Sequence, residues 1–405
     1  MFYKTTTSIN PEFQYFTKNR DTIFFLGAGF SADLGLPIMK DFRSASELER
    51  NLLSQEDTSI KPAVRIFLDS YRFYDDFREI VEKAKKHIKV DPDNFEDIFC
   101  VAESFLHSGM FAQKLDGGKY HMQDVYMHIG FWLWNMYKQF PPLDIRKGKT
   151  EEGRVYEDFF AFLKDKTRDR MSIVTTNYDL TCEYYMNKNR FQISYPIPKA
   201  KYKDVSICRC QNYYVNDRTS FDSVPLCKLH GSINYFENNK RFFINRELSE
   251  AGACVGGSSI PSERPALFAL DALSEIRSKL KNPLGQLRNF EIGVVPPTYA
   301  KLDKREWLKY IWNGAFDLIR RAKKIVFIGY SFPVSDGFMK SMFQAAFSLR
   351  GGDDDLRIIV VDKNKSVLEK FKSDDYFGNR VEEVFEGQFV DVWRKGELRA
   401  RLQSF

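Results

Sequence analysis

The sequence lacks the long apolar runs, the dense cysteine pattern and the internal repeats that would place it in several protein classes at once. No stretch approaches the roughly 20 consecutive apolar residues that a membrane-spanning helix needs, so no membrane association is expected. Residues 1–7 contain no apolar core of a signal peptide. Six cysteines are scattered over 405 residues, which indicates a reducing, cytoplasmic environment.

The cysteines also fall short of a zinc-site pattern. Cys208 and Cys210 are followed by Cys227 and Cys254. A structural zinc site is usually built from two knuckles, each with two cysteines about two to four residues apart. This spacing does not supply two knuckles, so we expect no metal.

An excess of charge of one sign is absent as well. The formal net charge is only +6, and 43% of the residues are hydrophobic, as in ordinary globular proteins. The basic clusters 83–86 and 320–324 fall on faces or ends of expected helices, where solvent or the helix dipole accounts for them. Direct nucleic-acid binding is therefore not expected. The 37 phenylalanines and 20 tyrosines indicate either thick helical packing or a large partner surface, and we expect a homo-oligomer.

A short apolar run at residues 22–26 ends in the turn Gly27-Ala28-Gly29-Phe30-Ser31, after which we expect a helix. In doubly wound sheets this order places a phosphate-binding turn before a helix N-terminus. The acidic residue expected about 20 residues later in dehydrogenases is missing, because residues 44–49 have a helical pattern. A hydride-transfer enzyme is therefore not expected, and a tight turn without any ligand remains the alternative.

Apolar runs at 171–176, 290–297, 324–331 and 357–362 alternate with helical patterns, and a further strand end is expected at 227–232. Such alternation predicts an α/β fold with a doubly wound, parallel, Rossmann-like sheet buried on both faces. We assign residues 1–39 and 151–405 to this domain.

Residues 40–150 have helical periodicity and are predicted to form an all-helical insertion. Apolar stripes cover about 73–84 and 95–106, and the segment 124–140 is apolar on nearly every face. We interpret that last helix as core rather than as a partner surface. A stretch rich in Gly, Ser and Pro at 249–265 predicts a loop near the site.

Polar or glycine-rich groups follow several of the predicted strands. They are the segments 27–31, 177–179, 329–331 and 362–364, with His230 at a further turn. Open α/β sheets bind ligands beyond the carboxyl ends of their strands, so these groups form the predicted site. Helix capping is the alternative role for Asn177 and Asp362, and a packed turn is the alternative for His230.

Taken in order, four motifs resemble the sirtuin superfamily over roughly residues 20–365: Gly-Ala-Gly-x-Ser with a later Gly-Leu-Pro, Thr-x-Asn-x-Asp, His-Gly, and Gly-x-Ser before a helix. Within that superfamily the chain is more similar to bacterial NAD-hydrolysing proteins of anti-phage systems than to protein deacylases. The segment 328–333 with a later Asp336, and residues 296–298, are typical of that branch. The paired-cysteine zinc module of the deacylases is absent.

The resemblance implies a role for each matching residue. Asn177 would hold the nicotinamide ribose and the attacking water. Asp179 would orient the loop that carries Asn177, and His230 would be the general base. The remaining residues would bind NAD as a substrate, at its phosphates or its adenosine side: Gly27, Ala28, Gly29, Ser31, Gly329, Ser331 and Asp362. A neutral-pH base and a polar group near the ribose suit this cleavage, which needs no strong acid.

The resemblance therefore implies an NAD glycohydrolase that depletes NAD in abortive anti-phage defence. It also implies a partner, such as a HerA-like ATPase, since the sheet runs almost to residue 390 and leaves no room for a sensor domain. Two alternatives remain open. One is an NAD-dependent protein deacylase, and the other is a catalytically silent nucleotide-binding module that regulates a partner assembly.

Overall fold

The structure is a computed structural model of the 405-residue chain, and it is described here for part of that chain. The described residues are 19–36, 74–79, 81–83, 91–108, 130, 133, 137, 150–166, 170–197, 202–204, 223–238, 241–244, 290–296, 305–333, 336–350 and 355–404.

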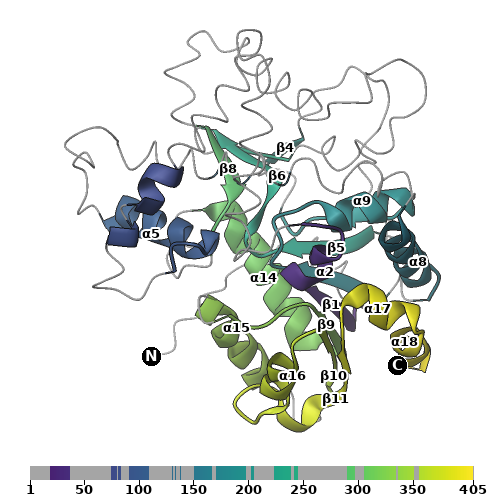
Figure 1. Cartoon of the computed structure of the whole chain (residues 1–405). Helices are drawn as coiled ribbons and strands as arrows, with labels where there is room; N and C mark the ends of the chain where they lie inside the picture. Colours follow the sequence, from purple (N-terminus) through teal and green to yellow (C-terminus); the bar gives the residue numbers. More distant parts are fainter. Residues whose placement is uncertain are drawn as a thin grey trace, which may run out of the picture.

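A seven-stranded parallel sheet forms the centre of the molecule, in the order β11-β10-β9-β1-β2-β5-β3 (Figure 1). The chain leaves β1 in the middle, builds one side through β2, and later builds the other side from β9. The α/β class and the doubly wound parallel sheet predicted from the sequence are confirmed. The strands are β1 (Thr22–Leu26), β2 (Met171–Thr175), β3 (Gln192–Ser194), β5 (Ser223–Lys228), β9 (Lys324–Ile328), β10 (Arg357–Asp362) and β11 (Val381–Glu386).

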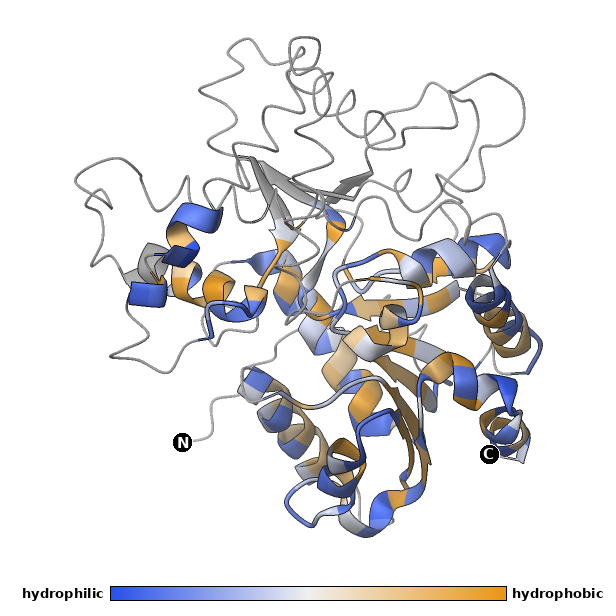
Figure 2. Ribbon diagram, viewed as in Figure 1, coloured by the Kyte–Doolittle hydropathy of each residue, from blue (hydrophilic) through white to orange (hydrophobic). Residues whose placement is uncertain are grey.

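Helices cover both faces of this sheet. They are α2 (Ala28–Ala32), α8 (Glu151–Lys166), α9 (Thr181–Lys188), α14 (Glu306–Arg321), α15 (Gly337–Ser348), α16 (Lys365–Lys372), α17 (Phe389–Arg394) and α18 (Glu397–Ser404), with a short 3₁₀ turn η5 (Gly378–Arg380). In Figure 1, α15 and α16 lie on one side of the strands, and α8, α17 and α18 on the other. Figure 2 shows the apolar strands sandwiched between these helices.

Alternating side chains of β1 show how the two layers are held. Every residue of β1 is buried, so successive side chains must face opposite layers. Phe24 packs edge-on against Phe159 of α8, with ring centroids 5.9 Å apart. Phe25 packs against Phe343 of α15 on the other face, at 5.7 Å. Burial of such rings contributes roughly 1.5–3 kcal/mol each, which fixes β1 as the central strand.

A second, smaller sheet was not foreseen. It has the order β4-β7-β6-β8 and contains β4 (Tyr202–Asp204), β6 (Gly231–Asn238), β7 (Arg241–Ile244) and β8 (Phe290–Val294). The run 290–297, which the sequence suggested for the parallel sheet, pairs antiparallel with β6 instead. Its apolar run alone could not distinguish the two sheets, because both bury it.

The described part of the 40–150 segment is largely helical, as predicted. It includes α5 (Phe95–Ser108), and residues 74–79, 81–83, 130, 133 and 137 are also helical. Leu133 and Tyr137 are buried, in agreement with the interpretation of the 124–140 helix as core. The limits of the insertion and the 249–265 loop lie outside the described residues, so the domain boundaries stay a prediction. Among the described helices, none is long and apolar enough to cross a membrane.

Candidate active site at the strand ends

The glycine turns after β1 and β9 pack directly on each other. These two strands are neighbours at the point where the chain switches from one side of the sheet to the other. A side-chain carbon on Gly27 would lie 2.6 Å from Cα of Tyr330, and one on Gly29 would lie 2.8 Å from Cα of Gly329. Gly329 itself has a φ of +63°, which favours glycine. The close approach of the two turns therefore explains all three glycines.

Hydrogen bonds join the same two turns. The Gly29 amide donates to the Gly329 carbonyl at 3.0 Å, and the Gly27 amide donates to the Ile328 carbonyl at 3.0 Å. The Gly27 and Gly29 amides are thus both used within the protein, and phosphate binding by the first turn stays a prediction. The helix that follows, α2, has only five residues.

Asn177 connects the end of β2 to the first turn. Its Nδ2 donates to the Gly27 carbonyl at 2.9 Å and to the Ser31 hydroxyl at 3.1 Å. Both amide hydrogens are used in these bonds, and Oδ1 remains as an acceptor. The capping alternative fails for Asn177, because the α9 amide of Thr181 is bound by Asp179 instead.

Asp179 has a structural setting behind Asn177. Its Oδ1 accepts the Thr181 amide at 2.8 Å, and its backbone carbonyl accepts a hydrogen bond from Lys228. Lys228 also forms a fully buried ion pair with Glu183 at 2.9 Å. These contacts hold the segment between β2 and α9 in place, and the role of Asp179 beside a substrate stays a prediction.

His230 lies in the two-residue connection between the two sheets, after β5 and before β6. Its position is fixed from both sides. Gly231 has a φ of +77°, and a side-chain carbon there would lie 2.9 Å from the carbonyl carbon of Gly293. The Val295 amide donates to the His230 carbonyl at 2.8 Å. The imidazole is 2% exposed.

The His230 ring contacts a carboxylate from the β9 side, and a phenol binds the same carboxylate. Nε2 lies 3.1 Å from Oδ2 of Asp336, the residue just before α15. The Tyr330 hydroxyl donates to the same oxygen at 2.9 Å. Burial, and then the Asp336 carboxylate, raise the pKa of Tyr330 well above its ordinary value, so the phenol keeps its proton.

Further contacts connect these groups along the carboxyl edge of the sheet. Tyr178 follows Asn177, and its ring centroid lies 6.1 Å from that of His230. Tyr330 packs beside Gly27 and reaches Asp336. The structure therefore brings together the first turn, Asn177, His230 and the β9 turn.

Ser331 and Asp362, two further residues of the predicted site, form hydrogen bonds within the protein. The Ser331 carbonyl accepts from Lys370 at 3.0 Å. The Asp362 carboxylate accepts the Asn364 amide at 2.8 Å, and Asn364 caps α16. Burial raises the pKa of Asp362 above its ordinary value. The cap of α16 is therefore Asn364 and not Asp362, whose carboxylate binds the turn before the cap, and ribose binding by Asp362 stays a prediction.

The helical segment approaches this site. Glu96, at the start of α5, contributes to the raised pKa of Tyr178 and of Tyr330, after the larger effect of burial. Asp179 in turn contributes to the raised pKa of Tyr137. A side-chain carbon on Gly130 would lie 3.9 Å from Cγ2 of Val294, so this part of the 40–150 segment lies beside β8.

The sequence reasoning missed Tyr330 and Lys228 and gave Asp336 no role. Asp336 appeared only as part of a motif, because its 106-residue separation from His230 hides the contact. Lys228 lies two residues before His230, but an isolated lysine at a strand end has no distinctive sequence signal.

The described residues contain no group of three or more metal-binding side chains. Cys227 is buried in β5, and burial raises the pKa of its thiol, which disfavours the thiolate that binds zinc. Cys208, Cys210 and Cys254 lie outside the described residues, so the expectation of no metal stays a prediction.

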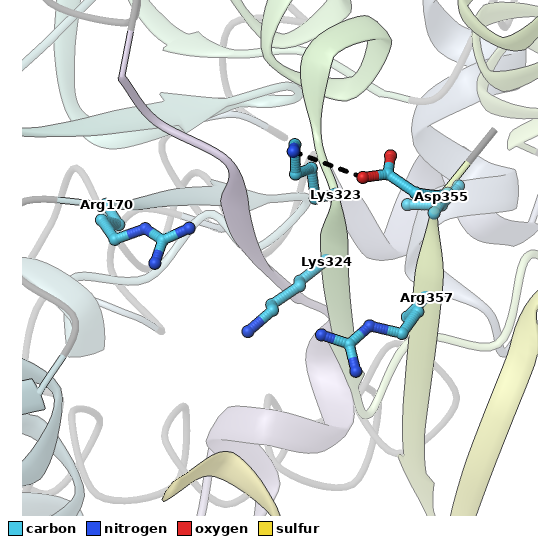
Figure 3. Close-up of a pocket in the computed structure, with 6 residues that line it drawn as sticks. Arg170, Lys323, Lys324, Asp355 and Arg357 are labelled. Carbon is cyan, nitrogen blue, oxygen red and sulfur yellow. Dashed lines mark ion pairs between the residues drawn. The ribbon is translucent and has the colours of Figure 1, made fainter. Parts of the chain in front are cut away.

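An open depression of about 550 Å³ lies at the opposite, amino-terminal edge of the sheet (Figure 3). Basic side chains line it, but several are paired with carboxylates. Arg170 binds Asp21, and Lys323 lies 3.3 Å from Asp355. Burial, and then the neighbouring Arg357 and Arg170, lower the pKa of Lys324. These pairs agree with the interpretation of the 320–324 cluster as a solvated surface.

No protein-family model matches the sequence, and no curated protein matches it. Three solved Sir2 or sirtuin structures are similar over nearly the whole chain. Sir2Tm bound to a propionylated peptide has a TM-score of 0.33 and 10% identity, and covers 96% of both chains. A Sir2–p53 peptide–NAD⁺ complex has a TM-score of 0.33 and 11% identity, over 97% of this chain and 98% of that one. A structure on sirtuin substrate affinity has a TM-score of 0.36 and 11% identity, over 95% and 96%. At these values the similarity is distant and does not by itself assign a function.

Proposed function

We propose that this chain is an NAD glycohydrolase that cleaves NAD to nicotinamide and ADP-ribose. The observation that carries the proposal is the position of Asn177, whose amide joins the Gly27 carbonyl to the Ser31 hydroxyl at the switch point of the sheet. That point is where open α/β sheets bind nucleotides. The sequence motifs that resemble the bacterial NAD-hydrolysing proteins supply the substrate class.

The residue types around Asn177 fit such a substrate. Oδ1 of Asn177 is an acceptor for a ribose hydroxyl or a water, and the Ser31 hydroxyl lies 3.1 Å from the amide of Asn177. His230 sits at the neighbouring strand end, against the ring of Tyr178. An amide oxygen, a hydroxyl and an imidazole are the groups that bind sugar hydroxyls and move a proton near neutral pH.

These residues divide the reaction between them. The bond between ribose and nicotinamide breaks with positive charge developing on the sugar, and water forms the new bond to the ribose carbon. Asn177 orients the sugar hydroxyls and the water through Oδ1. His230 accepts the proton that the water loses. The leaving nicotinamide needs no acid, because it departs as a neutral molecule.

Product analysis by chromatography tests the proposal. The purified protein is incubated with NAD alone, and again together with the protein of the neighbouring gene. We expect nicotinamide and ADP-ribose from the wild type, and a loss of about 10²-fold or more in Asn177→Ala and His230→Ala. Asn189→Ala, at the far end of α9, is the matched control and keeps full activity.

The same assay separates the alternatives. Turnover of an acetyl-lysine peptide together with NAD would identify a deacylase. NAD left intact under both conditions, while calorimetry still shows binding, would contradict the hydrolase and leave a regulatory module.

The cellular role is part of the proposal. We infer that the enzyme depletes NAD during phage infection, within an oligomer that a partner such as a HerA-like ATPase activates. The wild type with its neighbouring gene is then expected to lower cellular NAD after infection, and the Asn177→Ala strain to keep NAD at its uninfected level. Equal NAD loss in both strains would contradict this role.

A further inference from the structure

The contact between His230 and Asp336 joins the two halves of the site. His230 comes from the β5 side of the sheet, and Asp336 comes from the segment between β9 and α15. Their side chains are 2% and 3% exposed. Ionised carboxylates are seldom buried to this extent unless hydrogen bonds or charges compensate them.

The partners of Asp336 define its orientation. Oδ2 accepts from the Tyr330 hydroxyl at 2.9 Å and lies 3.1 Å from Nε2 of His230. Tyr330 is itself held by ring packing, with its centroid 4.8 Å from that of Phe25 in β1. The carboxylate is therefore anchored to the central strand of the sheet.

The backbone just after Tyr330, at Ser331 and Phe332, is also held in place. Phe332 has a φ of +49°, an unfavourable conformation for a bulky residue, and is nevertheless 4% exposed. Lys370 of α16 donates to the Phe332 carbonyl at 2.5 Å and to the Ser331 carbonyl at 3.0 Å. Strained backbone held by surrounding packing is found preferentially where side chains must be placed accurately.

This geometry favours one tautomer of the imidazole. An ionised carboxylate accepts hydrogen bonds and cannot donate them, so the contact with Asp336 favours the tautomer in which Nε2 of His230 carries the proton. In the neutral ring the lone pair is then on Nδ1.

We propose that Asp336 is the positioning residue for His230: it holds the ring in place and fixes the tautomer in which Nδ1 is the base. The inference rests on the proposed hydrolysis. There, the water oxygen bonds to the ribose carbon as the bond to nicotinamide breaks, and the water proton passes to Nδ1. The resulting imidazolium is stabilised by the Asp336 carboxylate.

The test combines kinetics with nitrogen NMR of the full-length protein labelled with ¹⁵N-histidine. His230→Ala identifies the His230 resonances by their disappearance. We expect the wild-type ring to carry its proton on Nε2. In Asp336→Asn we expect a mixture of tautomers, a fall in kcat of about 10²-fold, and an almost unchanged Kd for NAD by calorimetry.

Two further variants serve as an intermediate case and as a control. Tyr330→Phe keeps the ring packing and removes one hydrogen bond to Asp336, so we expect a smaller fall in kcat and a smaller tautomer change. This variant also replaces Asp336→Asn if the latter does not fold. Asp355→Asn alters a half-exposed carboxylate at the opposite edge of the sheet and should change neither measurement.

A wild-type ring protonated on Nδ1 would overturn the inference. So would an Asp336→Asn enzyme that loses activity while its His230 tautomer stays unchanged, since that result describes a purely structural role. If the wild type does not cleave NAD at all, the proposed function fails. In that case the inference about Asp336 is still tested by NMR, by comparing the His230 tautomer of the wild type with that of Asp336→Asn.

Discussion

Two stacked tyrosines near the first turn differ in a single hydrogen bond. Tyr156 of α8 stacks on Tyr185 of α9, with ring centroids 5.4 Å apart, and both rings are fully buried. The Tyr156 hydroxyl donates to the Phe30 carbonyl in α2. Among the described residues, the Tyr185 hydroxyl has no hydrogen-bond partner. Tyr156 and Tyr185 therefore allow a buried hydroxyl that forms a hydrogen bond to be compared with a neighbouring one that forms none.

We predict that Tyr156→Phe lowers the free energy of unfolding by about 1 kcal/mol or more, because the buried Phe30 carbonyl loses its donor. Tyr185→Phe removes a hydroxyl that forms no bond, and should change this free energy by less than about 0.5 kcal/mol or raise it. Urea unfolding measures both. Equal losses in the two variants would show that the Tyr156 hydrogen bond contributes nothing to holding α2.

At the scale of elements, the Lys228–Glu183 pair joins β5 to α9 directly behind Asn177 and His230. Both side chains are fully buried, and Lys228 also holds the Asp179 carbonyl. Burial raises the pKa of Glu183 above its ordinary value, although Lys228 acts in the opposite direction. The pair therefore fixes the site at the cost of desolvating two charges.

Lys228→Met should remove the attraction that lowers the pKa of Glu183, and this pKa should rise further. The unfolded chain still ionises Glu183 at its ordinary value, so the variant loses stability as the pH rises above that value. We predict a deficit of about 3–5 kcal/mol at neutral pH that narrows as the pH is lowered.

Urea unfolding at several pH values measures this deficit. The control is Lys228→Met combined with Glu183→Leu, which removes both charges and should recover most of the stability. A deficit in the single variant that does not change with pH would contradict an electrostatic role for the pair.

The sequence predicted the elements that have strong apolar patterns. Trp307, Ile311 and Ala315 recur at helical spacing in the sequence, and the structure buries this side of α14. The 290–297 run was assigned to the wrong sheet, because strand pairing depends on partners far away in the chain. The pairing of His230 with Asp336 was missed for the same reason.

At the scale of the whole molecule, the sequence motifs lie at the carboxyl edge of the sheet, at the ends of β1, β2, β5 and β9. The basic depression lies at the opposite, amino-terminal edge. At the first edge, burial and then Glu96 of α5 raise the pKa of Tyr178 well above its ordinary value. The second edge has its cations partly paired with carboxylates, as with Lys323 and Asp355. We therefore expect NAD to bind at the carboxyl edge and not in the basic depression.

Amide hydrogen exchange with and without NAD tests this claim most directly. His230→Ala is used so that NAD binds and is not consumed. We predict that NAD slows exchange together in peptides covering 27–31, 175–181, 228–233 and 327–333, and leaves peptides covering 170–171, 323–325 and 355–358 unchanged. Slowing confined to a single strand end, or centred on the basic depression, would contradict a single site assembled from the four strand ends.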